Sequence, residues 1–293
     1  MRLLSFSQNT TRSFGLLTQD GTGVVDLGSR LPHIPDLGAL VDEKNIDQAR
    51  AFTQTAGDMP LTSVTHERLL PHPNKIFCIG VNYQGRNAEY VDQSEASYPS
   101  VFLRFPESLT GHDQPLLRPP ESPQLDYEGE IVVVIGKAGR RIPRDQARDH
   151  IAGLTLGNEG TIRDWVRHAK FNVTQGKNWE SSGSMGPHLV TIDEIADFED
   201  LRLTTHVNGE KRQDDSPATM KYPIDYQISY LSTFTTLSPG DVIFTGTPTG
   251  AGARHEPPVW LRPGDIVEVS VPELGTLRNT VMDEPVDATA ARP

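Results

Sequence analysis

Two glutamates separated by one glycine stand at the start of an apolar run, in the segment LDYEGEIVVVIG. Residues i and i+2 of an extended strand point to the same face, so Glu128 and Glu130 are predicted to project side by side. Glutamate is mostly exposed, and such a pair is often no more than a solvated strand end. Here the following run, IVVVIG, is apolar on both faces, which predicts a buried strand with the pair beside a cavity. Two neighbouring carboxylates need a cation, and oxygen ligands favour Mg²⁺ first and Mn²⁺ second.

A third carboxylate is expected from the segment LGNEGTIRDWVR. Glu159 lies there at a turn before a predicted helix, four residues ahead of Arg163. Asp164 competes for the same role, but an Arg-Asp-Trp sequence within a helix is more typical of a structural ion pair. No Cys or His spacing supports zinc, so a hard divalent ion is the prediction.

Lys177 lies in a polar loop flanked by glycines, TQGKNWESSGSMGP. A surface lysine would satisfy this pattern. Beside a metal site, however, the same cation would bind a substrate carboxylate or offset developing negative charge. Further on, FTGTPTGAG predicts a strand running into a Gly/Thr/Pro turn whose hydroxyl and N–H groups line a pocket. No Gly-Lys-Ser/Thr follows, which excludes a P-loop.

The overall composition narrows the class of protein. The chain has 293 residues, 36% of them hydrophobic and 23% charged, as in ordinary globular proteins. Its net charge of −12 and the lack of a basic stripe argue against a nucleic-acid or anionic-membrane partner. No apolar run approaches the roughly 20 residues that span a bilayer, and the N-terminus lacks the apolar core of a signal peptide. A single cysteine, Cys78 in KIFCIG, predicts a buried core thiol and a cytoplasmic location.

The elements that must position these residues are mostly short strands, which predicts a mixed α/β fold rich in β-structure. Residues 1–70 are predicted to form a small β-rich N-terminal domain, with a hairpin turning at Asp-Gly and a helical stretch after it. Residues 71–293 are predicted to form the larger domain. Its expected strands are KIFCIGV, SVFLRF, EIVVVIG, HLVTI, LRLTTHVNG, DVIFTGT and IVEVSV, and its expected helices are PRDQARDHIAG, TIRDWVRHAK and PIDYQISYLSTFTT.

Several segments, in this order, resemble the fumarylacetoacetate hydrolase family. They are KIFCIGVNYQGRNAEY, DYEGEIVVVIGK, HIAGLTLGNEGTIRDW, GKNWESSGSMGP, VNGEKRQDD and LSPGDVIFTGTPTGAG, and they cover roughly residues 72–284. The resemblance implies a catalytic domain built as a β-roll of mixed sheets, a small N-terminal domain and a homodimer. It also implies activity on small 2-oxo acids or β-diketo acids, with a divalent metal held by the E-x-E pair and a later acidic residue.

Carried over by position, Glu128 and Glu130 would be the first two metal ligands and Glu159 the third, where the family commonly has Asp. The resemblance also assigns four residues to substrate binding: Tyr83, Arg163, Lys177 and Thr247. The glutamine that often follows the arginine by three residues is Val166 here, which predicts a more apolar pocket floor.

The largest departure from the family pattern lies in NYQGRNAEY. Many members have NY-x-x-H-x-x-E, in which His and Glu activate water on a lid helix. Here Glu89 is present, but Arg86 stands in the His position, and arginine stays protonated in proteins. Glu89 is therefore the expected base, with Arg86 orienting it or clamping the substrate. His168 and His188 are alternative bases, although each is more typical of a structural role.

Together these features predict a Mg²⁺- or Mn²⁺-dependent enzyme that acts on a 2-oxo or β-diketo acid through a metal-bound enolate. C–C hydrolysis of an acylpyruvate-like compound in catabolism is the first expectation. A 2-hydroxydienoate hydratase, a decarboxylase/isomerase and a non-catalytic metal-binding relative are the alternatives, and protonation of the same enolate would give tautomerisation. The loop GARHEPPVWLRPGD, which carries Arg254, His255 and Trp260, is equally compatible with shaping the pocket and with covering a sheet edge.

Overall fold

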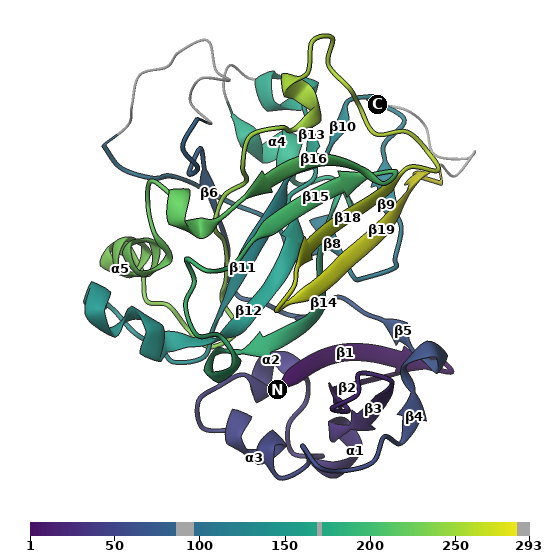
Figure 1. Ribbon diagram of the computed structural model, residues 1–293, viewed down its shortest axis with the longest axis vertical. Coiled ribbons are helices and arrows are strands. Elements are labelled where there is room, and N and C mark those ends of the chain that lie inside the picture. Colours follow the sequence, from purple (N-terminus) through teal and green to yellow (C-terminus); the bar gives the residue numbers. More distant parts are fainter. Residues whose placement is uncertain (86–96, 169–171, 286–293) are drawn as a thin grey trace.

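The computed structural model describes residues 1–85, 97–168 and 172–285 and shows a strand-rich mixed α/β fold. Figure 1 shows a large β-rich body above a smaller lobe that is formed by the N-terminal residues. The predicted fold class is therefore confirmed. No helix within the described residues has the length and apolar character required to cross a membrane.

The backbone of the fold is a mixed sheet that has 12 strands in the described part of the chain. Its order is β4 (Met59–Pro60), β3 (Gly23–Asp26), β2 (Thr11–Leu17), β1 (Arg2–Gln8), β14 (Gly183–Thr191), β12 (Ile151–Asn158), β11 (Gly129–Ile135), β17 (Val242–Phe244), β6 (Ile76–Gly80) and β7 (Ser100–Leu103). Two short strands lie beside this path, β5 (Thr65–His66) on β1 and β8 (Leu109–Thr110) on β14. β17 and β6 pair in parallel, whereas β11 pairs antiparallel with both of its neighbours.

A second sheet and a few helices cover the first. The second sheet runs β16 (Glu210–Asp215), β15 (Leu203–Val207), β18 (Ile266–Val271), β19 (Gly275–Asp283) and β9 (Leu116–Arg118), and β10 (Leu125–Asp126) pairs with β13 (Thr161–Ile162). The α-helices are α1 (Leu27–Arg30), α2 (Leu37–Leu40), α3 (Ile46–Arg50), α4 (Val173–Lys177) and α5 (Ile224–Phe234). Short 3-10 helices are η1 (Leu61–Ser63), η3 (Pro106–Ser108), η4 (Arg144–His150), η5 (Asp164–Arg167), η6 (Ile192–Glu194), η7 (Pro217–Thr219) and η8 (Gly252–Arg254).

β11 is buried on both faces, as its apolar sequence predicts. Ile131 and Val133 belong to the core that includes side chains of the second sheet and α5. Val132 and Val134 face the opposite way, into the core shared with the N-terminal lobe. This alternation is the period-2 geometry of a strand between two layers. Glu130 therefore leaves β11 on the same face as Val132.

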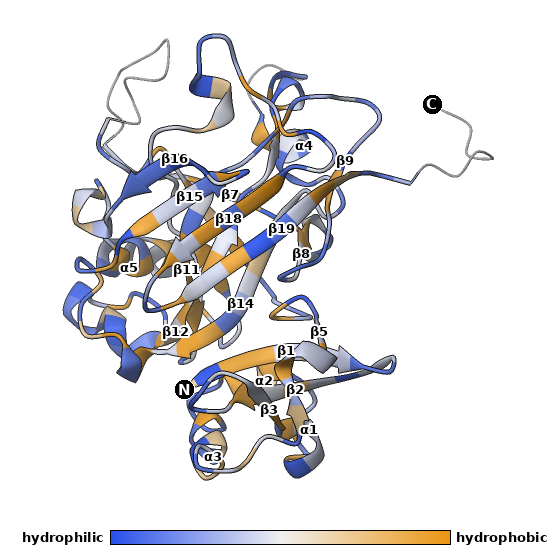
Figure 2. Ribbon diagram, turned by 45° about the vertical axis from the view of Figure 1, so that its right-hand side comes forward, coloured by the Kyte–Doolittle hydropathy of each residue, from blue (hydrophilic) through white to orange (hydrophobic). Residues whose placement is uncertain are grey.

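The N-terminal lobe is a continuation of the large sheet. β2 and β3 form the predicted hairpin, with Leu17 opposite Val24 and the Asp-Gly pair in the connecting turn. β1 then pairs antiparallel with β14, so that Arg2 lies opposite Val190. The division at residue 70 remains a prediction. Figure 2 shows the interior strand β1 as mainly apolar. The edge strand β16 is hydrophilic, which discourages another chain from pairing with that edge.

Two expected helices were wrong in part. The helix predicted from TIRDWVRHAK begins instead as strand β13 (Thr161–Ile162), which pairs with β10, and continues as the 3-10 helix η5 (Asp164–Arg167). The helix predicted from PRDQARDHIAG is the 3-10 helix η4, which ends at His150. Ile151 already begins β12, a fully buried strand that pairs with β11 and β14. Strand pairing on both sides overrides the local helical pattern, because it satisfies the backbone groups of an interior strand. This error matters, since β12 leads directly into the site.

Candidate active site

Gly129, between Glu128 and Glu130, faces the second sheet, and the two glutamates point away from that sheet. Glu128 is 3% exposed and Glu130 is 1% exposed. A Cβ on Gly129 would lie 2.0 Å from Oγ1 of Thr205 on β15, so no side chain fits on that face. The strand alternation then turns both glutamates to the other side. In the Glu-Gly-Glu sequence, the glycine lets the two sheets pack closely and the alternation places the two carboxylates on one face.

Glu159 is brought to the pair by the end of β12. Its N–H donates a hydrogen bond of 2.7 Å to the Glu128 carbonyl, and the Glu128 N–H donates one of 2.9 Å to Oδ1 of Asn158. The next residue, Gly160, has no space for a side chain, because a Cβ would lie 1.7 Å from the Ser182 carbonyl oxygen. Glu159 is 3% exposed. The predicted third carboxylate therefore lies beside the first two.

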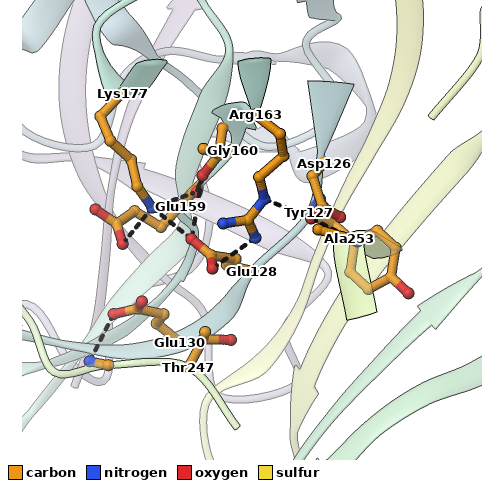
Figure 3. A network of polar contacts seen from close by, with 12 residues as sticks. Asp126, Tyr127, Glu128, Glu130, Glu159, Gly160, Arg163, Lys177, Thr247 and Ala253 are labelled. Atoms are coloured by element: carbon orange, nitrogen blue, oxygen red, sulfur yellow. Dashed lines mark hydrogen bonds and ion pairs between the residues drawn. The ribbon is translucent and has the colours of Figure 1, made fainter. Parts of the chain in front are cut away.

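Lys177, the last residue of α4, places its ammonium between two of the carboxylates. Its Nζ donates to Oε2 of Glu128 and, at 3.0 Å, to Oε2 of Glu159 (Figure 3). The side chain is buried, and burial alone would lower the pKa of this amine. The charges of Glu128 and Glu159 outweigh burial and raise the pKa above its usual value. Lys177 is thus a buried, charged group and not a surface lysine.

Arg163 connects the pair to a fourth carboxylate that the sequence reasoning missed. Its Nη2 donates to Oε1 of Glu128 at 2.8 Å, and its Nε donates to Oδ2 of Asp126 at 2.7 Å. Asp126 is fully buried. The alternation Asp-x-Glu-x-Glu could have indicated it, because residues 126, 128 and 130 share one face of an extended segment.

Glu130 turns to a different partner from Glu128. Its Oε2 accepts a hydrogen bond of 2.7 Å from the Gly246 N–H, and Figure 3 shows it on the far side of the cluster from Arg163. Its pKa lies well above the ordinary value, first because the carboxyl is buried and then because Glu159 and Glu128 are close. Thr247, next to Gly246, donates its hydroxyl to the Gly129 carbonyl at 2.9 Å. The Gly-Thr-Pro turn at residues 246–248 is therefore hydrogen-bonded to β11.

These side chains surround a cavity of about 230 Å³. Six of the predicted site residues line it: Glu128, Glu130, Glu159, Arg163, Lys177 and Thr247. Val166 and Val173 give it an apolar wall, as expected where the family's glutamine is absent. Arg167 and Arg254 also line it, and Arg254 places part of the loop GARHEPPVWLRPGD at the pocket.

Three other candidates, Tyr83, His168 and His188, do not line this cavity. Tyr83 is 2% exposed, packs in the hydrophobic core and is not among the residues that line the cavity. His168 stacks on Trp165 with ring centroids 3.9 Å apart, and His188 is a buried residue of β14. Neither histidine lines the cavity. Arg86 and Glu89 lie outside the described residues.

Cys78 is a fully buried thiol of β6, as predicted. Burial, followed by the charge of Glu159, raises the pKa of the thiol well above its usual value. A thiol that is this strongly protonated is a poor nucleophile.

By its chemistry, although not by its spacing in this structure, the donor set suits a hard divalent cation. The three glutamates offer only oxygen, and Oε1 of Glu159 is buried with no hydrogen-bond partner in the described part of the chain. The pKa of Glu130 is raised first by burial and then by the charges of Glu159 and Glu128, which a bound cation would offset. Within residues 1–85, 97–168 and 172–285, no three Asp, Glu, His or Cys side chains are gathered closely enough to share an ion. Lys177 stands between Glu128 and Glu159 and neutralises part of their charge instead.

Comparison with known proteins identifies the family of this chain. Residues 75–282 match the family model described as fumarylacetoacetate (FAA) hydrolase, C-terminal. The chain belongs to the fumarylacetoacetate hydrolase family. A mitochondrial oxaloacetate tautomerase of Xenopus laevis is 34% identical over 96% of this chain and 90% of its own length. An oxaloacetate tautomerase of Bacillus subtilis (strain 168) is 40% identical over 75% of this chain and 74% of its own.

A solved structure of the family shows a divalent ion. It is the maleylpyruvate hydrolase of Sphingobium sp. SYK-6 in complex with manganese(II) and pyruvate, which is 25% identical, with a TM-score of 0.80 over 97% of this chain and 100% of the other. The chain is thus an enzyme of a family that includes tautomerases and hydrolases, and divalent metal use occurs in that family.

Proposed function

We propose that this enzyme interconverts the enol and keto forms of a 2-oxo acid of the oxaloacetate type. The observation that carries the proposal is the buried ammonium of Lys177 among three carboxylates in one small cavity. A 2-oxo acid enolate is an anion whose charge must be offset as it forms. The similarity to oxaloacetate tautomerases, over 96% of this chain in one case, supports this choice of reaction.

Glu128, Glu130 and Glu159 would hold a Mg²⁺ or Mn²⁺ ion. When bound, such an ion supplies positive charge that lowers the cost of forming an enolate oxygen. The protein itself contributes two further cations. Lys177 and Arg163 line the cavity as hydrogen-bond donors, and donors that are already oriented need no reorganisation when charge develops. Val166 and Val173 exclude water from part of the same space, which strengthens these electrostatic interactions.

The proton transfer is assigned to Glu89, with Arg86 as its orienting cation. Tautomerisation moves one proton between the carbon next to the 2-oxo group and the 2-oxygen, and it consumes no water. C–C hydrolysis, the first expectation from the sequence, requires in addition a base that activates water. In the pattern that the resemblance implies, a histidine and a glutamate share that task, and Arg86 in the histidine position cannot act as a base because its guanidinium stays protonated. Glu89 is therefore left without the histidine for activating water. The chain's own residues therefore support tautomerisation better than hydrolysis.

The test is a pair of assays on the purified protein with Mn²⁺. Loss of the ultraviolet absorbance of enol-oxaloacetate measures tautomerisation, and cleavage of an acylpyruvate measures hydrolysis. We expect a tautomerisation rate above the metal-and-buffer background that falls with EDTA and in Glu128→Ala. The matched control is Glu43→Ala, an exposed glutamate of the N-terminal lobe. Acylpyruvate cleavage without tautomerisation, or full activity in Glu128→Ala, would refute the proposal.

A further inference from the structure

The chain leaves β6 through a residue in an unusual backbone conformation. Val81 follows Gly80, the last residue of β6, and has a φ of +55°. A β-branched residue rarely adopts a positive φ, because its side chain collides with the neighbouring backbone there. Such strain persists where the surrounding structure imposes it, and it is concentrated at functional sites. Val81 lines the cavity of the candidate active site, as Ile79 and Gly80 do.

Asn82 holds the chain in this conformation. Its side chain is fully buried, and its Nδ2 donates to the carbonyls of Tyr222 at 3.1 Å and of Thr245 at 2.7 Å. Its Oδ1 accepts from the Tyr222 N–H at 2.8 Å, and its backbone carbonyl accepts from the Lys221 N–H at 2.7 Å. Asn82 therefore joins the end of β6 to the residues ahead of α5 and to the residue that follows β17. An ordinary negative φ at Val81 would rotate the following chain and move this amide away from its partners.

The contact with Thr245 also fixes the backbone N–H that binds Glu130. Gly246 follows Thr245, and its N–H donates to Oε2 of Glu130 at 2.7 Å (Figure 3). The Thr245 hydroxyl donates to the Ile131 carbonyl at 2.8 Å, which ties this segment to β11. Gly246 has a φ of +107°, and a Cβ there would lie 2.6 Å from the Cβ of Asn82. Asn82 thus packs directly against the residue that holds the carboxylate.

We propose that Asn82 is a positioning residue of the active site, which holds Val81 as a wall of the cavity and sets the N–H group that orients Glu130. The inference rests on the metal site of the proposed function. Asn82 does not line the cavity, so it acts through Val81 and Gly246. Residues that orient metal ligands from behind typically change metal affinity 10- to 100-fold when they are replaced. An asparagine with a purely structural role would stabilise the fold and leave the affinity for the ion unchanged.

The first experiment measures Mn²⁺ binding to Asn82→Ala by calorimetry. The matched control is Asn279→Ala, because Asn279 is also buried and donates to two carbonyls, those of Gly111 and Gln114, each at 2.8 Å. Asn279 belongs to β19 and does not line the cavity. We expect both variants to unfold at a lower urea concentration, because each loses buried hydrogen bonds. Only Asn82→Ala should lower the affinity for Mn²⁺, by about 10- to 100-fold.

The second experiment tests the strain at Val81 and does not depend on the folding of Asn82→Ala. It compares the urea unfolding of Val81→Gly with that of Val101→Gly, since Val101 is also half-buried but lies in strand β7 with an ordinary φ. Glycine adopts a positive φ readily but destabilises a strand. We expect Val101→Gly to lower the urea midpoint and Val81→Gly to leave it unchanged or raise it. In the Asn82→Ala background, Val81→Gly should lower the midpoint, because the strain is no longer imposed.

Three results would overturn the inference. They are an equal change in Mn²⁺ affinity in Asn82→Ala and Asn279→Ala, a loss of stability in Val81→Gly as large as that in Val101→Gly, and an effect of Val81→Gly that is the same in both backgrounds. The tautomerisation assay separates this inference from the proposed function. Asn82-dependent binding of Mn²⁺ without tautomerisation contradicts the proposed function alone. Tautomerisation by an enzyme whose Mn²⁺ affinity does not depend on Asn82 contradicts the inference alone.

Discussion

Replacing Lys177 by methionine should make the metal-free protein less stable and should increase its affinity for Mn²⁺. Lys177 is 5% exposed, and the side chains of its partners Glu128 and Glu159 are 5% and 3% exposed. Breaking a buried ion pair by removing one partner costs about 3–5 kcal/mol, because the other charge is left uncompensated. We expect that loss in the free energy of unfolding by urea, measured in EDTA.

The gain in metal affinity has the same origin. An ammonium and a divalent ion about 5 Å apart repel each other by roughly 7 kcal/mol at an effective dielectric constant of 20. Lys177 can withdraw and avoid part of this cost, so only a fraction of it appears in the binding free energy. We expect the affinity of Lys177→Met for Mn²⁺ to rise at least tenfold, which corresponds to about 1.4 kcal/mol of binding free energy. Calorimetric titration with Mn²⁺ measures it.

Lys75→Met is the matched control. Lys75 pairs with the buried Asp241 at 2.7 Å but does not line the cavity. It should lower stability without changing the affinity for Mn²⁺. If Lys177→Met is as stable as the unmodified protein in EDTA, or if its affinity for Mn²⁺ falls, then the reasoning from a buried, charge-balanced cluster is wrong.

Three further predictions follow from the same structure. Gly129→Ala should lower the free energy of unfolding by about 1–3 kcal/mol, measured in urea, because its Cβ would lie 2.0 Å from Oγ1 of Thr205. Glu159→Gln should abolish calorimetric Mn²⁺ binding while the circular dichroism stays native, and unchanged binding would exclude Glu159 as a ligand. Burial lowers the pKa of His66 to about 4 and of His188 to about 3. In the unfolded chain both would have a pKa near 6.5, so the unfolded state binds more protons between these values and protein stability is highest above pH 6.5. Stability should fall as the pH drops from 6.5 towards these values, and a His66→Gln/His188→Gln protein with the same pH slope in urea unfolding would contradict this.

Local patterns were sufficient for much of the site. The alternation of Glu128 and Glu130 ahead of an apolar run indicated two carboxylates on one face of a buried strand, and both are buried at the cavity. The period of a strand is a property of neighbouring residues, so it can be read without knowing the fold. Glu159 and Lys177 were candidates from their own segments, the family resemblance implied the same roles, and the structure brings both to the same cavity.

Other parts depended on contacts between distant segments. β12 was predicted in part as helix, because nothing within its own residues shows that β11 and β14 will pair with it. Asp126 was missed because its partners Gly252 and Ala253 lie more than a hundred residues away. Tyr83 was expected at the substrate and lies in the core.

By itself, the sequence determined the strand-rich class of the fold, the family and the set of carboxylates that face one cavity. Each of these is carried by residue type, by spacing along one strand or by the order of several segments. Only the tertiary structure decided that Lys177 lies between Glu128 and Glu159, and that Asp126 orients both Arg163 and the loop of Arg254. The physical reason is that these contacts join separate strands and loops, whose distances are set by the packing of two sheets and not by any local pattern.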